Sequence, residues 1–283
     1  MDTVKISAAD VKKLRDQTGA GMMDCKKALT ESAGDFDKAI EILRKKGQKL
    51  SDKRADRETK EGVVIAVTSD DRNNGVILRL GCETDFVAKT DGFIDLAKKI
   101  ADIALKNLPE SSEALEALPF EGDLTVGAKI TEQVGVIGEK LNLGGYSKLV
   151  TAAGEGQVIP YIHMGYRAGV IVALNLEGPN MVEAGKNVAM QVAAMRPIAL
   201  DKDGVDPSVI EKEIEIGKEV ARKAGKPEEM LEKIAMGKLN KFYKERTLLN
   251  QMFVKDNKKT IAAYLQSIDP KLTVTDYKHV ELG

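Results

Sequence analysis

The sequence predicts an α+β protein made of several parts, and three observations support this prediction. Three short amphipathic segments follow one another within about the first 47 residues. Beyond a highly charged stretch, the order strand, strand, helix occurs twice. Two long amphipathic segments joined by Gly225-Lys226-Pro227 then predict a pair of antiparallel helices. At 283 residues, the chain is long enough for two or three domains.

Residues 1–48 are predicted to form a three-helix domain. Ser7-Ala8-Ala9-Asp10 has the form of a capping box and starts the first helix, which Thr18-Gly19-Ala20-Gly21 ends. The side chains expected to face the small core are Val11, Leu14, Met22, Cys25, Ala28, Leu29, Phe36, Ala39, Ile40 and Leu43. Because Met22 and Met23 are adjacent on a helix, both cannot face this core, and one is expected to be exposed.

Residues 49–61 are predicted to be a charged linker. The stretch from Leu50 to Gly62 is almost entirely polar and carries both signs of charge without apolar periodicity. This pattern is typical of a linker or of a solvated helix. We therefore expect a domain boundary here.

Residues 62–143 are predicted to form the first of two related α+β subdomains. Val63–Val67 and Val76–Leu78 are expected to pair as a hairpin, and Thr90-Asp91 opens a helix. A polar connection with one or two weak helical turns should lead to a second helix, which Gly144-Gly145 ends. The apolar positions of the two helices are Phe93, Leu96, Ile100 and Ile103, then Val126, Ile130, Val134, Ile137 and Leu141.

Residues 144–205 and 244–283 are predicted to form the second subdomain. Strands are expected at Tyr146–Val150, Val158–Ile159 and Gly169–Leu174, and a capping-box form at Asn180 should start the following helix. A short helix over Lys258–Leu265 and a strand over Leu272–Val280 are expected to complete it.

Residues 206–243 are predicted to be an inserted helical hairpin. Asp206-Pro207 starts its first helix with proline in the first turn. The two apolar stripes can pack on each other, which leaves Ile216, Met236 and Tyr243 without an assigned contact. These side chains either dock on the parent domain or bind another molecule.

The composition argues against several classes of function. Lys and Arg number 43 against 44 Asp and Glu, and this balance argues against general nucleic-acid binding. Cys25 and Cys82 are far apart, which favours reduced thiols in the cytoplasm. Only two histidines are present, so no metal site is predicted. No apolar run is long enough for a membrane span, and Met1-Asp2-Thr3 does not begin a signal peptide.

The sequence predicts neither an enzyme nor a cofactor. Asp85 and Asp91 could be read as paired carboxylates, but nothing nearby supplies a nucleophile or an oxyanion donor. Cys82 has no neighbouring histidine, and a buried inert thiol is the commoner state. No glycine-rich loop with its lysine is present to hold a phosphate group.

The stretch from Gly81 to Ala88 connects a predicted strand to a predicted helix, so it should lie at the surface. It places Phe86 and Val87 beside Asp85. This arrangement is either an apolar tip that enters another molecule or a hydrophobic staple folded over the helix start. The pattern alone favours the staple.

A resemblance changes that balance. Thr84-Asp85-Phe86-Val87-Ala88 resembles the signature loop of the translation elongation factor Ts family. The stretch from Leu14 to Leu29 resembles the N-terminal signature of that family more closely still, and the two lie in the family's order. The resemblance extends over nearly the whole chain. The first three helices are also similar to a ubiquitin-associated domain.

The resemblance implies a guanine-nucleotide exchange factor for the GTPase elongation factor Tu. Arg15, Met22 and Met23 would then grip the partner's nucleotide-binding domain. Asp85 and Phe86 would enter beside the partner's Mg²⁺ and diphosphate, and Thr84 and Val87 would shape this tip. The second subdomain has Glu177-Gly178-Pro179-Asn180 in the place of the loop.

Two further features have alternative interpretations. The segment from Tyr161 to Val170 resembles a family segment that contacts a distal partner domain through His163, but His163 is equally explained as a satisfied residue at a strand edge. In the family, the hairpin resembles a region used for self-association or for reaching the partner. The rival functions are a ubiquitin-like adaptor, suggested by the N-terminal helices, and a cysteine-dependent enzyme, suggested by Cys82.

Overall fold

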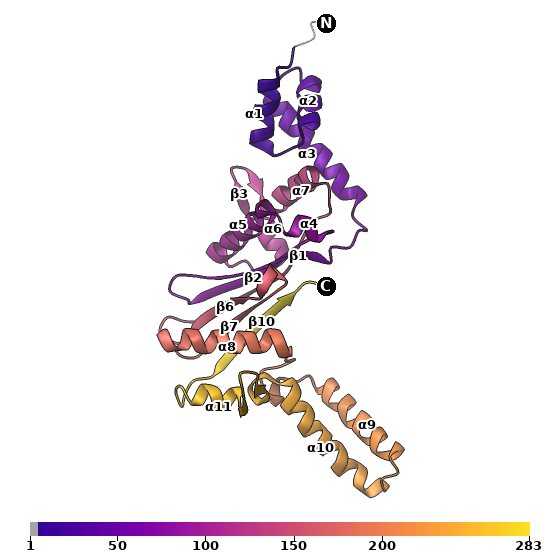
Figure 1. Ribbon diagram of the computed structural model, residues 1–283, viewed down its shortest axis with the longest axis vertical. Helices are drawn as coiled ribbons and strands as arrows, with labels where there is room; N and C mark the ends of the chain where they lie inside the picture. Colours follow the sequence, from indigo (N-terminus) through magenta and orange to yellow (C-terminus); the bar gives the residue numbers. More distant parts are fainter. Residues whose placement is uncertain (1–4) are drawn as a thin grey trace.

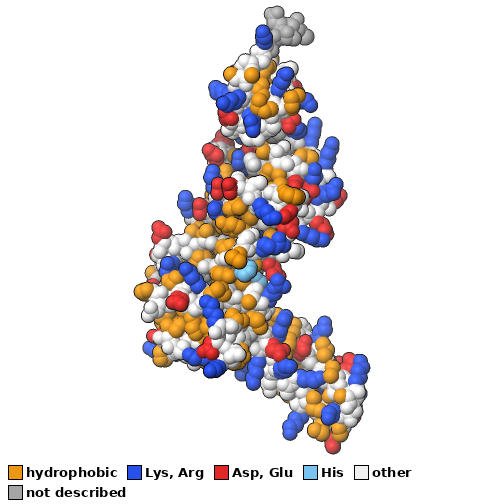
Figure 2. Space-filling view, in the orientation of Figure 1, with side chains coloured by type: hydrophobic (Ala, Val, Ile, Leu, Met, Phe, Trp, Pro, Cys, Tyr) orange, Lys and Arg blue, Asp and Glu red, His pale blue; other side chains and the backbone are white. Residues whose placement is uncertain are grey.

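The computed structural model describes residues 5–283 and shows an elongated α+β molecule (Figure 1). A helical domain lies at one end, two sheets with their helices form the middle, and a helical hairpin projects from the other end. The α+β fold class is confirmed. Figure 2 shows acidic and basic side chains interspersed over the visible face, as the balanced charge predicts. The expectation that no signal peptide is present rests on Met1-Asp2-Thr3, and this stretch lies outside the described residues.

The N-terminal domain forms because each helix has a local start or stop signal and one apolar face. The Ser7 hydroxyl accepts a hydrogen bond from the Asp10 N–H, the Asp10 carboxylate accepts one from the Ser7 N–H, and Gly19 ends the first helix at φ 72°. Leu14, Cys25 and Leu29 are fully buried in the resulting core. The three helices are α1 (Ala8–Thr18), α2 (Met22–Glu31) and α3 (Phe36–Lys53).

The helix α3 continues to Lys53, so the first part of the predicted linker is helical. Its extension packs against a helix of the core. A Cβ atom at Gly47 would lie only 2.9 Å from the Thr131 carbonyl oxygen, so glycine is what allows this close approach. The domain boundary in this region stays a prediction.

The first sheet pairs three antiparallel strands in the order β1-β2-β5. Apolar side chains on one face, including Val63, Leu78 and Leu80, pack against Phe93 and Ile100 of the helix α5. The elements of this part are β1 (Glu61–Thr68), β2 (Asn74–Cys82), α4 (Asp85–Ala88), α5 (Asp91–Asn107), α6 (Ser112–Glu116), β3 (Pro119–Glu121), β4 (Leu124–Thr125), α7 (Val126–Ile137) and β5 (Asn142–Val150).

Two expectations for this part were wrong. The helix α7 ends at Gly138, which adopts φ 83°, and not at Gly144-Gly145. Leu141 is therefore outside the helix although it is buried. The strand β5 begins at Asn142 and pairs with β2, so residues 144–150, assigned to the second subdomain, extend the first sheet. The start of β5 depends on pairing with β2, which is distant in the sequence, so local periodicity does not predict it.

The second sheet repeats the arrangement of the first in the order β10-β7-β6. Its outer face is covered by Val188 and Val192 of α8 and by Leu265 of α11. The inner faces of the two sheets pack on each other through Val64, Ile77, Leu149, Val158 and Ile171. The elements are β6 (Gln157–Ile162), η1 (Met164–Tyr166), β7 (Ala168–Leu174), α8 (Pro179–Met195), η2 (Lys202–Gly204), η3 (Leu248–Asn250), β8 (Met252–Phe253), β9 (Asp256–Thr260), α11 (Ile261–Gln266) and β10 (Val274–Glu281).

Two helix starts in this part also differ from expectation. The helix α8 begins at Pro179 without a side-chain cap, so the capping-box form at Asn180 is not used. The helix α11 begins at Ile261, because Lys258 and its neighbours pair in β9 and the Thr260 hydroxyl caps the helix.

The hairpin is formed by α9 (Pro207–Lys223) and α10 (Glu228–Arg246), packed side by side. A Cβ atom at Gly217 would lie 3.0 Å from the Ala235 Cα atom, so the two backbones approach closely. Figure 1 shows the hairpin pointing away from the sheets. Ile216 and Met236 are each 42% exposed, so a large part of each side chain is uncovered, while Tyr243 is half-buried.

Candidate functional site

The predicted tip forms a single helical turn, α4, directly after β2. The Thr84 hydroxyl caps it by accepting a hydrogen bond from the Val87 N–H at 3.5 Å. Ala88 is buried and Val87 is half-buried against the first core, so this side of the turn faces inward. Phe86 lies on the opposite side and is 82% exposed. The staple interpretation, which places Phe86 over the helix start, is therefore wrong.

Asp85 lies beside Phe86 on the exposed side of the turn. Its carboxylate accepts a hydrogen bond from the Lys89 ammonium group at 2.6 Å. This hydrogen bond holds the pKa of Asp85 below its ordinary value. The tip therefore presents an aromatic ring next to an ionised carboxylate.

Cys82 lies beneath the surface, in contact with the residue that caps α4, and is not available as a nucleophile. Its thiol is fully buried and donates a hydrogen bond to the Thr84 carbonyl oxygen at 3.1 Å. Burial, with the nearby Glu139 carboxylate, raises the pKa of the thiol to about 12. A thiol in this state is inert at neutral pH.

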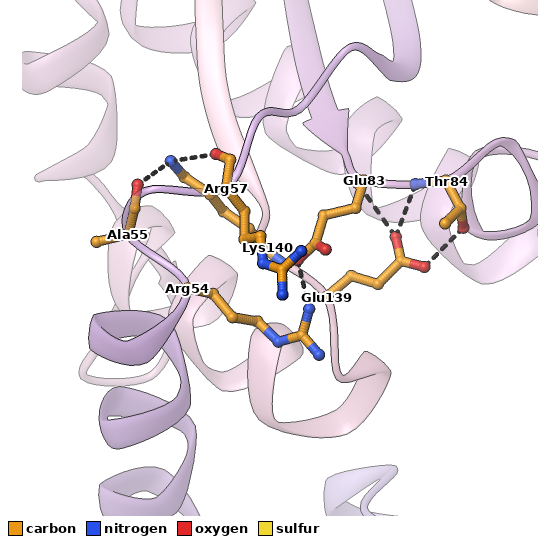
Figure 3. A network of polar contacts seen from close by, with 7 residues as sticks. All are labelled: Arg54, Ala55, Arg57, Glu83, Thr84, Glu139 and Lys140. Carbon is orange, nitrogen blue, oxygen red and sulfur yellow. Dashed lines mark hydrogen bonds and ion pairs between the residues drawn. The ribbon is translucent and has the colours of Figure 1, made fainter.

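The Glu139 carboxylate holds the segment that precedes the tip (Figure 3). Its Oε2 atom accepts hydrogen bonds from the backbone N–H groups of Glu83 at 3.1 Å and Thr84 at 3.0 Å. Its Oε1 atom accepts a third from the Thr84 hydroxyl at 2.6 Å. One carboxylate thus satisfies three donors at the start of α4.

The side chain of Glu83 connects the same segment to the end of α3 (Figure 3). Its Oε1 atom accepts hydrogen bonds from the Arg54 guanidinium group and from the Lys140 N–H, each at 2.6 Å. The Lys140 ammonium group donates to the carbonyl oxygens of Ala55 at 2.5 Å and Arg57 at 2.8 Å. Burial opposes ionisation of Glu83, but these hydrogen bonds and the Arg54 charge outweigh it and lower the pKa.

Arg15, Met22 and Met23 lie around the turn between α1 and α2. The Arg15 carbonyl oxygen accepts a hydrogen bond from the Gly19 N–H at 2.7 Å, and the Arg15 side chain is exposed. Met22 is 45% exposed and Met23 65%. The expected inward position of Met22 was wrong, because Cys25, Ala28 and Leu29 alone fill the buried face of α2.

The turn between α1 and α2 and the residue that holds the tip, Glu139, lie at the same end of α7. A Cβ atom at Gly19 would lie 3.7 Å from the Val136 Cγ1 atom, in the last turn of α7. Glu139, which holds the tip, follows three residues later. Two regions about 65 residues apart in the sequence therefore share one support.

His163 lies apart from this support, in the turn between β6 and β7. Its ring is exposed, and its Nδ1 atom is 3.1 Å from the Tyr161 hydroxyl oxygen. The next residue, Met164, is 87% exposed. An open groove beside the turn is lined in part by Arg167, Arg196 and Lys255. The strand-edge interpretation of His163 matches these contacts, and its role toward a partner stays a prediction.

Five residues near these regions are not identified from the sequence: Arg54, Glu83, Glu139, Lys140 and Met164. The helix predicted to end at Gly144-Gly145 includes Glu139, and no contact is predicted for this residue. Gly138 was the available signal, because glycine commonly ends a helix and frees the next side chain from helical spacing. No local signal marked Arg54 or Glu83, whose partners are distant in the sequence.

Within residues 5–283, no three His, Cys, Asp or Glu side chains cluster in a way that would hold a metal ion. None of the helices described is long and apolar enough to cross a membrane.

The fold and the site define an α+β protein whose candidate site is a set of exposed side chains and not an enclosed pocket. Comparison with known proteins agrees with this class. The family model described as Elongation factor TS matches residues 83–283. The chain is 54% identical to elongation factor Ts of Cytophaga hutchinsonii over 98% of this chain and 99% of the relative. The corresponding protein of Christiangramia forsetii is 51% identical, over 99% of both chains. That of Porphyromonas gingivalis is 44% identical, over 98% of both. The chain belongs to the elongation factor Ts family.

Proposed function

We propose that this protein is a guanine-nucleotide exchange factor for elongation factor Tu and so supports translation elongation. Membership of the elongation factor Ts family supports the proposal. The observation that carries it is the exposed ring of Phe86, beside the ionised Asp85, on a turn fixed to the first core. An apolar ring held in water gains free energy when a partner buries it.

The mechanism requires no chemical reaction by this chain. Arg15, Met22 and Met23 bind a helix of the partner's nucleotide-binding domain, and exposed methionine suits an adaptable apolar contact. Asp85 and Phe86, shaped by Thr84 and Val87, enter beside the partner's Mg²⁺ and diphosphate. Because Mg²⁺ neutralises phosphate charge, disturbing its ligands weakens the binding of GDP. The protein is thus a binding factor and not an enzyme.

Linkage sets the thermodynamics of this exchange. The factor binds the nucleotide-free partner more tightly than the loaded one. It therefore weakens nucleotide binding by the same factor by which nucleotide weakens its own binding. Each ~1.4 kcal/mol of this coupling corresponds to tenfold in affinity.

The other predicted features have places in this proposal. His163 contacts a distal domain of the partner, and the hairpin 206–243 contacts either the partner or a second copy of the chain. No direct contact with nucleic acid is needed. The protein acts in the cytoplasm, where its partner works.

The first test is the release of fluorescent GDP from a purified Tu-type GTPase, measured by stopped flow with and without this protein. Phe86→Ala should slow the stimulated release about tenfold, which corresponds to ~1.4 kcal/mol. Because the ring is exposed, the free energy of unfolding should change by less than about 0.5 kcal/mol.

Val150→Ala is the matched control. Val150 is also an exposed apolar residue, 59% exposed, but it lies at the end of β5 and outside the proposed contacts. It should leave the release rate unchanged. An unaltered rate for Phe86→Ala would refute the role of the tip, and no stimulation by the parent protein would refute the proposed function.

A further inference from the structure

The tip is held by a residue that lies outside every segment predicted to touch the partner. Glu139 accepts three hydrogen bonds from the segment before α4, and its carboxylate forms no ion pair within residues 5–283. We propose that Glu139 is a positioning residue for nucleotide exchange, which fixes α4 in the orientation that presents Phe86. This inference rests on the proposed function.

The geometry gives Glu139 more influence than an ordinary surface carboxylate. Its partners are two consecutive backbone N–H groups and the hydroxyl of Thr84, which is itself the cap of α4. Hydrogen bonds to a carboxylate are about twice as strong as those between neutral groups. The helix α4 has only four residues and is too short to be stable alone, so its orientation depends on such tertiary contacts.

The same contacts fix the tip relative to the N-terminal domain. Glu139 follows the end of α7 on which the Gly19 turn packs, and Glu83 is bound to Arg54 at the end of α3. When Arg15, Met22 and Met23 hold the partner, the tip is therefore already placed for entry. This is preorganisation: the loss of conformational freedom is incurred on folding and not at the moment of exchange.

The test separates the rate of exchange from the affinity. Stopped-flow release of fluorescent GDP is measured over a range of factor concentrations for the parent, Glu139→Ala and Glu139→Gln. Glu139→Ala should lower the maximal release rate about tenfold, because a mobile tip must be ordered during exchange. The concentration that gives half of this rate should change little, because the N-terminal contacts remain.

The two further variants distinguish positioning from general destabilisation. The amide of Glu139→Gln can still accept from both N–H groups and donate to the Thr84 hydroxyl, so its maximal rate should stay close to the parent's. Glu132→Ala is the control on α7: the Glu132 side chain is 16% exposed, and it pairs with Lys129 and, at 4.0 Å, with Arg44 of α3, but not with the tip. It should leave the maximal rate unchanged.

Amide hydrogen exchange of the free chain provides a readout that does not need the partner. The N–H groups of Glu83 and Thr84 should lose protection in Glu139→Ala and keep it in Glu132→Ala. Unchanged protection, an unchanged maximal rate for Glu139→Ala, or an equal loss of rate in Glu132→Ala would each overturn the inference. Failure of the parent protein to stimulate GDP release would refute the proposed function. The amide hydrogen-exchange data would still show whether Glu139 holds the tip.

Discussion

At the scale of single residues, the direction in which each side chain of α4 points sets which of them lie at the surface. Phe86, Val87 and Ala88 are consecutive apolar residues, yet only Phe86 is exposed, because one helical turn directs its neighbours toward the first core. The sequence identifies these residues as a candidate site through a family signature. It cannot give their directions, since a tip and a staple have the same local pattern. The contacts of Ala88 and Val87 with the core decide between them.

The ionisation of Glu83 gives the region a defined pH dependence. Its pKa is lowered in the folded protein, so its contribution to stability is present above the ordinary value of 4.5 and is lost as the pH falls through the folded value. At pH 7, Glu83→Gln should lower the free energy of unfolding by about 1 kcal/mol, because it removes a hydrogen-bonded charge from Arg54.

Urea titrations of the parent and of Glu83→Gln over pH 3–7 measure this effect. The difference in the free energy of unfolding should be constant near neutral pH and should shrink below about pH 4.5. A difference that grows toward low pH would contradict the assigned ion pair.

At the scale of elements, the sequence was reliable where the signals are local. The Ser7–Asp10 capping box, the Pro207 helix start and the continuous apolar runs of β1 and β2 all lie where the structure has them. It was less reliable where an end depends on a partner. The helix α7 ends at Gly138 and β5 begins at Asn142, because pairing with β2 draws these residues into the first sheet.

The hairpin is an element that can be removed cleanly. The chain segments that flank it are hydrogen-bonded to each other: the Ile198 N–H donates to the Arg246 carbonyl oxygen, and the Leu248 N–H donates to that of Ala199. Replacing residues 207–245 by a short glycine-serine linker should leave the cooperative melting of the remainder intact. It should change either the oligomeric state or the affinity for the GTPase, as the exposed Ile216 and Met236 lead us to expect.

Light scattering and titration with the GTPase measure the two quantities. If both match the parent protein, the hairpin has neither of the proposed binding roles.

At the scale of the whole molecule, three parts are arranged along one axis (Figure 1). The N-terminal domain packs on α7 through Gly47 and the Gly19 turn, and the two sheets pack on each other. This arrangement sets the distance between the exposed methionines of α2 and the tip α4. A partner that binds both surfaces must therefore present contacts separated by that same distance.

Removal of residues 1–53 tests the division into parts. The remainder keeps both sheets and their cores, so it should still unfold cooperatively, with lower stability because α7 loses its cover. Binding to the GTPase should weaken strongly, since Arg15, Met22 and Met23 are removed. Calorimetry and titration measure these results; a non-cooperative melt of the remainder would contradict the division.

The sequence by itself determined the α+β class, most element positions, the family and the residues of the tip, because these follow from local periodicity, helix capping and contiguous motifs. Only the tertiary structure decided that Phe86 points outward, that β5 joins the first sheet, and that Glu139 and Arg54 hold the tip. The physical reason is distance along the chain: Arg54 and Glu139 reach the Glu83-Thr84 segment across 29 and 55 or more residues. No local pattern encodes such a contact, which exists only once the core has brought its partners together.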